Sequence, residues 1–133
     1  MPNPPEQLTL GPGLPFTYEI KQNSAKTNDG AEEKYNEIIL AGKLEFLSNP
    51  DIEKNFCELP AITEKKMVLN LQKISFVNSL GLNFLLNEYE KCGKTDHKLY
   101  LSNVGTYVKK VLTITKLDNV FKILNSPEEC VKF

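Results

Sequence analysis

The chain has 133 residues, of which 41% are hydrophobic and 25% are charged, and its formal net charge is −1. These values fit one globular domain with a real core. They exclude a disordered chain, which would have fewer apolar residues or a larger net charge. The balanced charge gives no reason to expect direct contact with nucleic acid or with an anionic membrane surface. No segment reaches the ~20 apolar residues that a membrane-spanning helix needs.

The three cysteines, Cys57, Cys92 and Cys130, are widely spaced and form no Cys-x-x-Cys pair. An odd number in this pattern predicts neither a disulfide framework nor a zinc site. The N-terminus has no basic start followed by an apolar run, so no signal peptide is expected. These features together predict a cytoplasmic protein whose thiols stay reduced.

The first fifteen residues contain five prolines and two glycines. Proline fixes its own backbone angle and lacks an N–H donor, which disfavours regular structure. We therefore interpret residues 1–15 as an extended leader that partly drapes on a single domain, which is expected to comprise residues 16–133.

Alternating apolar residues then predict two strands. In the first strand Phe16, Tyr18 and Ile20 alternate with polar residues, and the second strand covers 38–46. The polar segment 22–34 contains an Asn-Asp-Gly turn sequence and is predicted to be a long hairpin loop. The two strands are expected to form an antiparallel ribbon.

The rest of the chain alternates helices with strands. Helix signals occur at 49–60, 79–92, 104–112 and after 126, and strand signals at 67–71, 98–101 and 120–124. The clearest helix is 79–92, with apolar residues at i, i+3, i+4 and i+7, and Gly93 follows at the position of a left-handed cap. Residues 72–77 are interpreted as a short connector into this helix. Such alternation implies parallel strand pairs with right-handed crossovers.

No arrangement typical of catalysis, cofactor binding or metal binding stands out. His97 is the only histidine, and it lies in a polar turn, where an exposed side chain is the ordinary explanation. The sequence contains no P-loop, no Gly-x-Gly-x-x-Gly and no His-Glu-x-x-His motif. We therefore expect no enzyme activity, no catalytic residue, no cofactor and no metal site.

The turn before the clearest helix is different. Asn78 can cap the helix, and Ser79 would lie in the first turn, where unpaired N–H groups favour an anion. A phosphoryl group on Ser79 would add a charge of about −1.5 to −2 at such a place. Gly81 lowers helix propensity but lets another backbone approach closely. The alternative is an ordinary helix cap, with Gly81 serving only tight packing on the sheet.

A strand of hydrophobic-hydrophobic-Asn-Leu type at 68–71 is followed by Asn-Ser-Leu-Gly-Leu at 78–82. This pattern resembles the STAS domain of bacterial anti-sigma factor antagonists, the SpoIIAA-like family, where Asp-Ser-x-Gly-Leu opens the helix. The likeness extends from about residue 38 to residue 131 and includes Gly-Lys-Leu at 42–44 and Val-Phe at 120–121. The resemblance implies an α/β fold with a mixed β-sheet of four to five strands and helices packed mainly on one face.

The resemblance also implies a function. In the family, a partner kinase that doubles as an anti-sigma factor phosphorylates the serine of the turn, and a phosphatase resets it. The unphosphorylated form binds this partner and thereby frees the sigma factor. Transferred position by position, the phosphoacceptor is Ser79, and Asn78, Leu80, Gly81 and Asn83 are expected to contact the partner. Direct nucleic-acid or membrane binding is not expected, and formation of a homodimer is left open.

Asn78 stands where the family usually has Asp, which removes a negative charge beside Ser79. This departure, together with the leader, motivates a second hypothesis, a STAS scaffold module that binds partners without phosphorylation. A small-ligand or lipid-handling STAS domain is a third hypothesis, and an enzyme is a fourth.

Overall fold

A computed structural model of the chain describes residues 6–9, 16–44 and 62–133. The elements within these residues are, in order, β1 (Glu6–Thr9), β2 (Phe16–Lys26), β3 (Glu32–Leu44), β4 (Lys66–Val77), α1 (Ser79–Lys94), β5 (Lys98–Ser102), α2 (Thr106–Ile114), η2 (Leu117–Asn119), β6 (Ile123–Leu124) and η3 (Pro127–Lys132). The helix predicted over 49–60 lies outside the described residues. No helix in the described part is long and apolar enough to cross a membrane.

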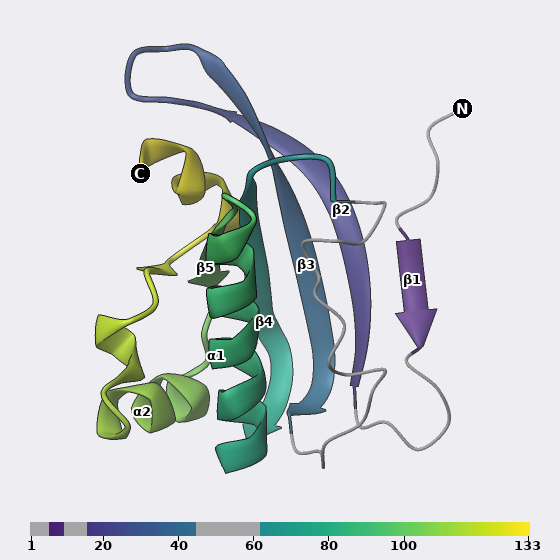
Figure 1. Cartoon of the computed structure of the whole chain (residues 1–133), viewed down its shortest axis with the longest axis vertical. Helices are drawn as coiled ribbons and strands as arrows, with labels where there is room; N and C mark the ends of the chain where they lie inside the picture. The colour runs from purple at the N-terminus through teal and green to yellow at the C-terminus, as the bar shows by residue number, and fades with distance from the viewer. Residues whose placement is uncertain (1–5, 10–15, 45–61) are drawn as a thin grey trace.

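The strands form one sheet in sequence order, from β1 at one edge to β6 at the other (Figure 1). β1, β2 and β3 are antiparallel, and β3, β4, β5 and β6 are parallel neighbours. This arrangement confirms the predicted antiparallel ribbon followed by parallel pairs. The sheet has six strands, more than the four to five expected, because Glu6–Thr9 of the leader adds an edge strand that pairs with β2.

The main core lies between one face of the sheet and the helices α1 and α2, which Figure 1 shows on the same side. Strand residues of alternating position supply the sheet side of this core, and apolar residues at helical spacing supply the other side. Fully buried examples are Ile38 and Leu40 of β3, Leu69 of β4, Leu101 of β5, Leu85 of α1 and Leu112 of α2. Full burial of each such side chain contributes roughly 1.5–3 kcal/mol.

A smaller cluster covers one end of the opposite face, where η3 packs on the sheet. Its members are Tyr35, Val68, Tyr100, Leu124, Cys130 and Val131. The expected mixed sheet with helices mainly on one face is therefore confirmed.

The prediction of a long loop over 22–34 is wrong. β2 continues to Lys26 and β3 restarts at Glu32, and every residue between Gln22 and Lys26 has a partner in β3. The turn itself is short, with Thr27 N–H donating to the Ala31 carbonyl at 2.7 Å. The sequence pattern does not indicate this part of the ribbon, because its side chains are mostly polar. Pairing of the two backbones holds it together. Figure 1 shows the hairpin projecting beyond the neighbouring strands.

Three element boundaries also differ from the prediction. Residues 72–77 continue β4 as far as Val77 rather than forming a connector, and register shifts against β3 disturb their alternation. Gly93 lies inside α1, whose cap is Thr95, and the left-handed residue is Asp96 with φ 62°. The last strand contains only Ile123–Leu124, because the N–H groups of Val120 and Phe121 bond back to the Leu117 carbonyl.

The cysteines differ from the expectation as well. Cys92 is fully buried and disulfide-bonded, whereas Cys130 is a free buried thiol. The expectation of unpaired cysteines is therefore wrong at Cys92. Because disulfides are rare in reducing compartments, the cysteines do not support a cytoplasmic location.

Candidate functional site

The turn singled out by the sequence lies where β4 ends and α1 begins. Asn78 has extended backbone angles (φ −117°, ψ −173°), and its side-chain oxygen accepts the Gly81 N–H at 3.0 Å. Its main-chain carbonyl accepts the Leu82 N–H at 2.9 Å, the first bond of the helix. Asn78 is therefore the N-cap of α1, as its residue type predicts.

The end of β3 holds this turn in place through the main chain of Leu44. The Asn78 N–H donates to the Leu44 carbonyl oxygen at 3.1 Å. Gly81 packs so closely that an added Cβ would lie 2.1 Å from the same oxygen. The backbone that approaches Gly81 thus belongs to this chain, which supports tight packing on the sheet as its structural role. A direct partner contact by the buried Gly81 stays a prediction.

The other residues of the turn are open to solvent. Ser79, Leu80 and Asn83 are exposed, and Asn78 is half-buried. Because residues three and four apart lie on one side of a helix, Asn83 lies beside Ser79 and Leu80. Leu80 keeps 39% of its surface exposed, although it is a large apolar residue. The structure therefore brings four of the five predicted residues onto one accessible patch at the start of α1, whereas Gly81 is buried. The patch consists of Asn78, Ser79, Leu80 and Asn83.

The electrostatics of this patch favour an anion. The first turn of α1 contains no acidic side chain. Among the described residues, no acceptor is bonded to the N–H groups of Ser79 and Leu80, since only the Gly81 and Leu82 groups are engaged. Free N–H groups and the helix dipole together create a partial positive charge at the exposed Ser79 hydroxyl.

Sequence reasoning missed an aromatic pair next to the turn. The rings of Phe76, near the end of β4, and Tyr107, in α2, are stacked with centroids 6.1 Å apart and planes at 17°. Tyr107 is 48% exposed, so the pair leaves aromatic surface exposed beside the end of β4. The period of α2 could have indicated Tyr107, because it falls outside the face formed by Val108 and Leu112.

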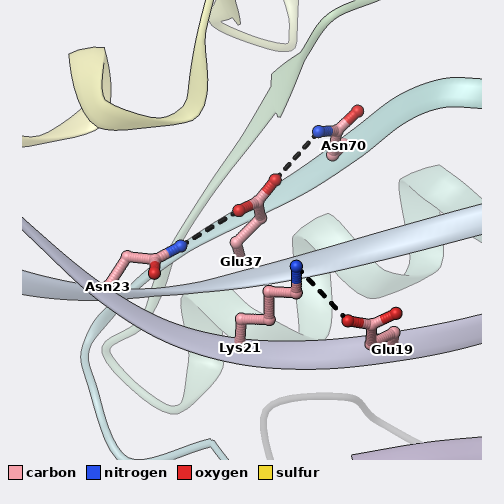
Figure 2. A network of polar contacts seen from close by, with 5 residues as sticks. All are labelled: Glu19, Lys21, Asn23, Glu37 and Asn70. Atoms are coloured by element: carbon pink, nitrogen blue, oxygen red, sulfur yellow. Dashed lines mark hydrogen bonds and ion pairs between the residues drawn. The ribbon is translucent and has the colours of Figure 1, made fainter. Parts of the chain in front are cut away.

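A second missed feature is a polar network on the sheet face that α1 does not cover (Figure 2). Glu37 of β3 accepts hydrogen bonds from the side-chain amides of Asn23, at 3.0 Å, and Asn70, at 2.8 Å. Asn70 also accepts the Gln72 N–H at 3.0 Å. Glu37 is only 9% exposed and Asn70 only 8%. This network ties β2, β3 and β4 together and fixes Asn70, eight residues before the cap.

The described residues contain no group of three or more His, Cys, Asp or Glu side chains placed to hold a metal. His97 is half-buried, and its Nδ1 lies 2.8 Å from the Thr95 hydroxyl oxygen. The ring is thus engaged locally at the end of α1, far along the helix from Ser79.

The sequence profile of the STAS domain matches residues 27–130. The chain therefore belongs to the STAS domain family. An anti-sigma-B factor antagonist of Staphylococcus aureus is 21% identical over 97 residues, which are 73% of this chain and 90% of that protein. A STAS-domain containing protein of Pseudomonas aeruginosa is 28% identical over 86 residues, which are 65% of this chain and 84% of that protein.

Two solved structures share the fold. An anti-sigma factor antagonist from Mycobacterium paratuberculosis superposes with a TM-score of 0.60 at 20% identity, covering 84% of this chain and 91% of that chain. The anti-sigma factor antagonist SpoIIAA in its unphosphorylated form gives a TM-score of 0.55 at 17% identity, covering 84% and 90%. The chain thus has the STAS fold of anti-sigma factor antagonists.

Proposed function

We propose that the protein is a regulatory binding module of the anti-sigma factor antagonist type, which docks through the patch at the start of α1 and is switched at Ser79. The observation that carries the proposal is the exposed Ser79 hydroxyl at a helix start that lacks acidic side chains. The docking surface consists of Asn78, Ser79, Leu80 and Asn83, extended by Phe76 and Tyr107.

A phosphoryl group on Ser79 would change this surface through charge. It adds about −1.5 to −2 charges, which the free N–H groups of the first turn can accept without unfolding the helix. A partner that covers Leu80 and Tyr107 would have to remove water from the phosphate, and burying an uncompensated charge is costly. Phosphorylation is therefore expected to leave the fold intact and to prevent docking.

The partners follow from the relatives. The Staphylococcus aureus relative is an anti-sigma-B factor antagonist, so the proposed partner is an anti-sigma factor that also acts as a serine kinase. A phosphatase would reverse the modification, and no catalytic role is proposed for this chain itself. A cytoplasmic location and a homodimer belong to the same proposal. The location rests on the partners alone, because the cysteines no longer support it.

Asn78 favours one alternative, a scaffold that binds without phosphorylation. The amide oxygen in place of the usual carboxylate still caps the helix, because it accepts the Gly81 N–H at 3.0 Å. It offers no negative charge to a kinase, however. In this alternative the protein keeps its fold and docks with its partner, but phosphorylation of Ser79 does not regulate the docking.

The test is to incubate the protein with the anti-sigma factor kinase of its own organism and ATP, and to map phosphate by mass spectrometry. We expect one phosphate on Ser79 and none on the Ser79→Ala variant. Ser75→Ala is a matched control, because Ser75 is also exposed and lies in the same region of the chain. Phosphate on another residue, or unchanged labelling of Ser79→Ala, would contradict switching at Ser79.

A further inference from the structure

A groove of about 400 Å³ lies at the end of α1 opposite to Ser79. Its lining includes Tyr89 and Gly93 of α1, Leu99 of β5, and Val120, which follows η2. Gly93 is fourteen residues after Ser79, which is roughly 20 Å along the helix axis. The groove is therefore separate from the proposed docking surface. Figure 1 shows this half of α1 next to β5.

The groove is apolar and has room for a side chain. Tyr89 is 37% exposed and Val120 is 40% exposed, although both are large hydrophobic residues. The ring of Tyr89 is held edge-on against Phe121, with centroids 5.3 Å apart and planes at 75°. A Cβ added to Gly93 would meet nothing within 4 Å. The space over Gly93 is thus open to an apolar side chain of a ligand.

Leu99 of β5 brings main-chain hydrogen-bonding groups to the groove. Lys98 N–H donates toward β4, to the Lys65 carbonyl at 2.8 Å, and Leu101 N–H donates toward β6, to the Lys122 carbonyl at 3.0 Å. Because backbone groups alternate in direction along a strand, the N–H and C=O of Leu99 point to the same side as those of Leu101. β6 pairs only with Leu101 and Ser102. Within the described residues no strand is paired with Leu99 on this side, so the groove offers the main chain of this one residue, which is 5% exposed.

The rim carries more positive than negative charge. Lys98 and Lys122 line the groove together with one carboxylate, Glu90. The Lys122 ammonium also lies 4.1 Å from the centroid of the Phe133 ring. This excess of cations in a chain of net charge −1 favours a ligand with carboxylates.

We propose that this groove binds an extended acidic segment of a partner protein. One peptide group of the segment bonds to the main chain of Leu99, one apolar side chain fills the space over Gly93, and flanking carboxylates meet Lys98 and Lys122. The apolar and charged contacts supply the affinity and the specificity, and the main-chain bond fixes the direction of the segment. The site does not depend on Ser79 or on its modification.

The probe is a fluorescein-labelled pentapeptide, Glu-Thr-Phe-Thr-Glu, which places the phenylalanine and both carboxylates on one side of an extended chain. Binding is followed by fluorescence anisotropy and by amide chemical shifts, up to about millimolar peptide, the weak end of specific binding. We expect saturable binding with shifts at Gly93, Leu99 and Val120 rather than at Ser79. The peptide Lys-Thr-Phe-Thr-Lys should bind at least about tenfold more weakly, a difference of about 1.4 kcal/mol.

Two variants complete the test. Gly93→Phe fills the groove at a position with free space. The double variant Lys98→Glu, Lys122→Glu reverses the charge at the rim of the groove. Each should weaken the probe at least about tenfold, whereas Lys110→Glu, an exposed charge change in α2, should not. Circular dichroism and the unfolding midpoint establish that each variant is folded. Absence of saturable binding, equal binding of both peptides, or shifts centred on Ser79 would overturn the proposal.

Discussion

The carbonyl oxygen of Leu44 and the Cα of Gly81 are so close that a Cβ on Gly81 would lie 2.1 Å from this oxygen. The same oxygen accepts the Asn78 N–H at 3.1 Å. The end of β3 thus fixes both the cap and the first turn of α1. The exposed residues of the candidate site have a defined geometry because of this contact.

Gly81→Ala should therefore destabilise the protein, although alanine is the better helix former by about 1 kcal/mol. Backbone atoms cannot move aside cheaply, and overpacking of this kind costs about 1–3 kcal/mol. Gly81→Val should be worse and should also impair partner docking. The measurement is the free energy of unfolding in urea.

Gly93→Ala is the matched control in the same helix. A Cβ there meets no atom within 4 Å, so the variant should gain up to about 1 kcal/mol from helix propensity. Equal effects of the two substitutions would show that the Leu44 contact is not tight.

The cap gives a second prediction. Asn78→Ala removes the acceptor of the Gly81 N–H and should cost about 1 kcal/mol. Asn78→Asp keeps an acceptor oxygen and adds a favourable charge at the helix N-terminus, so its stability should equal or exceed that of the wild type. Thermal unfolding of the three proteins at low salt compares them. A destabilised Asn78→Asp variant would refute the capping account.

The Glu37 network gives a third prediction. Glu37→Ala leaves the amide of Asn70, which is 8% exposed, without its acceptor at 2.8 Å. An unsatisfied buried donor costs about 1–3 kcal/mol. In a double-mutant cycle, Glu37→Ala and Asn70→Ala should couple by about 0.5–3 kcal/mol in the free energy of unfolding. Strict additivity would mean that the two side chains do not interact.

Alkaline pH gives a fourth prediction, because the cluster under η3 holds three weak acids. Burial raises the pKa of Tyr35 from 10.0 to about 12 and the pKa of Cys130 from 9.0 to about 12. Burial also raises the pKa of Tyr100. The native state thus keeps protons that the unfolded chain releases above pH 9 to 10. Stability should be unaffected by these groups below about pH 9 and should fall as the pH rises toward 12.

Urea unfolding midpoints measured between about pH 7.5 and pH 10.5 check this sign. Cys130→Ala removes one titrating group, so the decline of its midpoint with pH should be shallower than in the wild type. A variant with the same pH slope would show that the thiol ionises equally in both states.

Much of the fold could be predicted from local patterns. The period of α1 and the short apolar run of β4 are strong signals, and Asn78 was expected to be the cap because few residue types suit that position. The ribbon beyond Gln22 could not be found, because its side chains are polar and only the ladder with β3 reveals it. The shortened β6 depends on a turn formed by Leu117, which apolar content does not indicate.

In the candidate site, too, some features could be predicted from the sequence and others could not. Ser79, Leu80 and Asn83 could be placed on one exposed face because helix geometry relates them. The partner of Gly81 could not be identified, because Leu44 is distant in the sequence and the two meet only after β3 and β4 pair. The same holds for the stacking of Phe76 on Tyr107, which requires α2 to fold back beside β4.

The central claim is that a partner docks on the start of α1 and that charge at Ser79 prevents it. The most direct test is calorimetric titration of the anti-sigma factor of the same organism with the wild type, Ser79→Ala and Ser79→Asp. We expect Ser79→Ala to bind like the wild type and Ser79→Asp to lose at least about tenfold in affinity, or about 1.4 kcal/mol, with its unfolding midpoint unchanged. Wild-type affinity of a folded Ser79→Asp variant would contradict the switch.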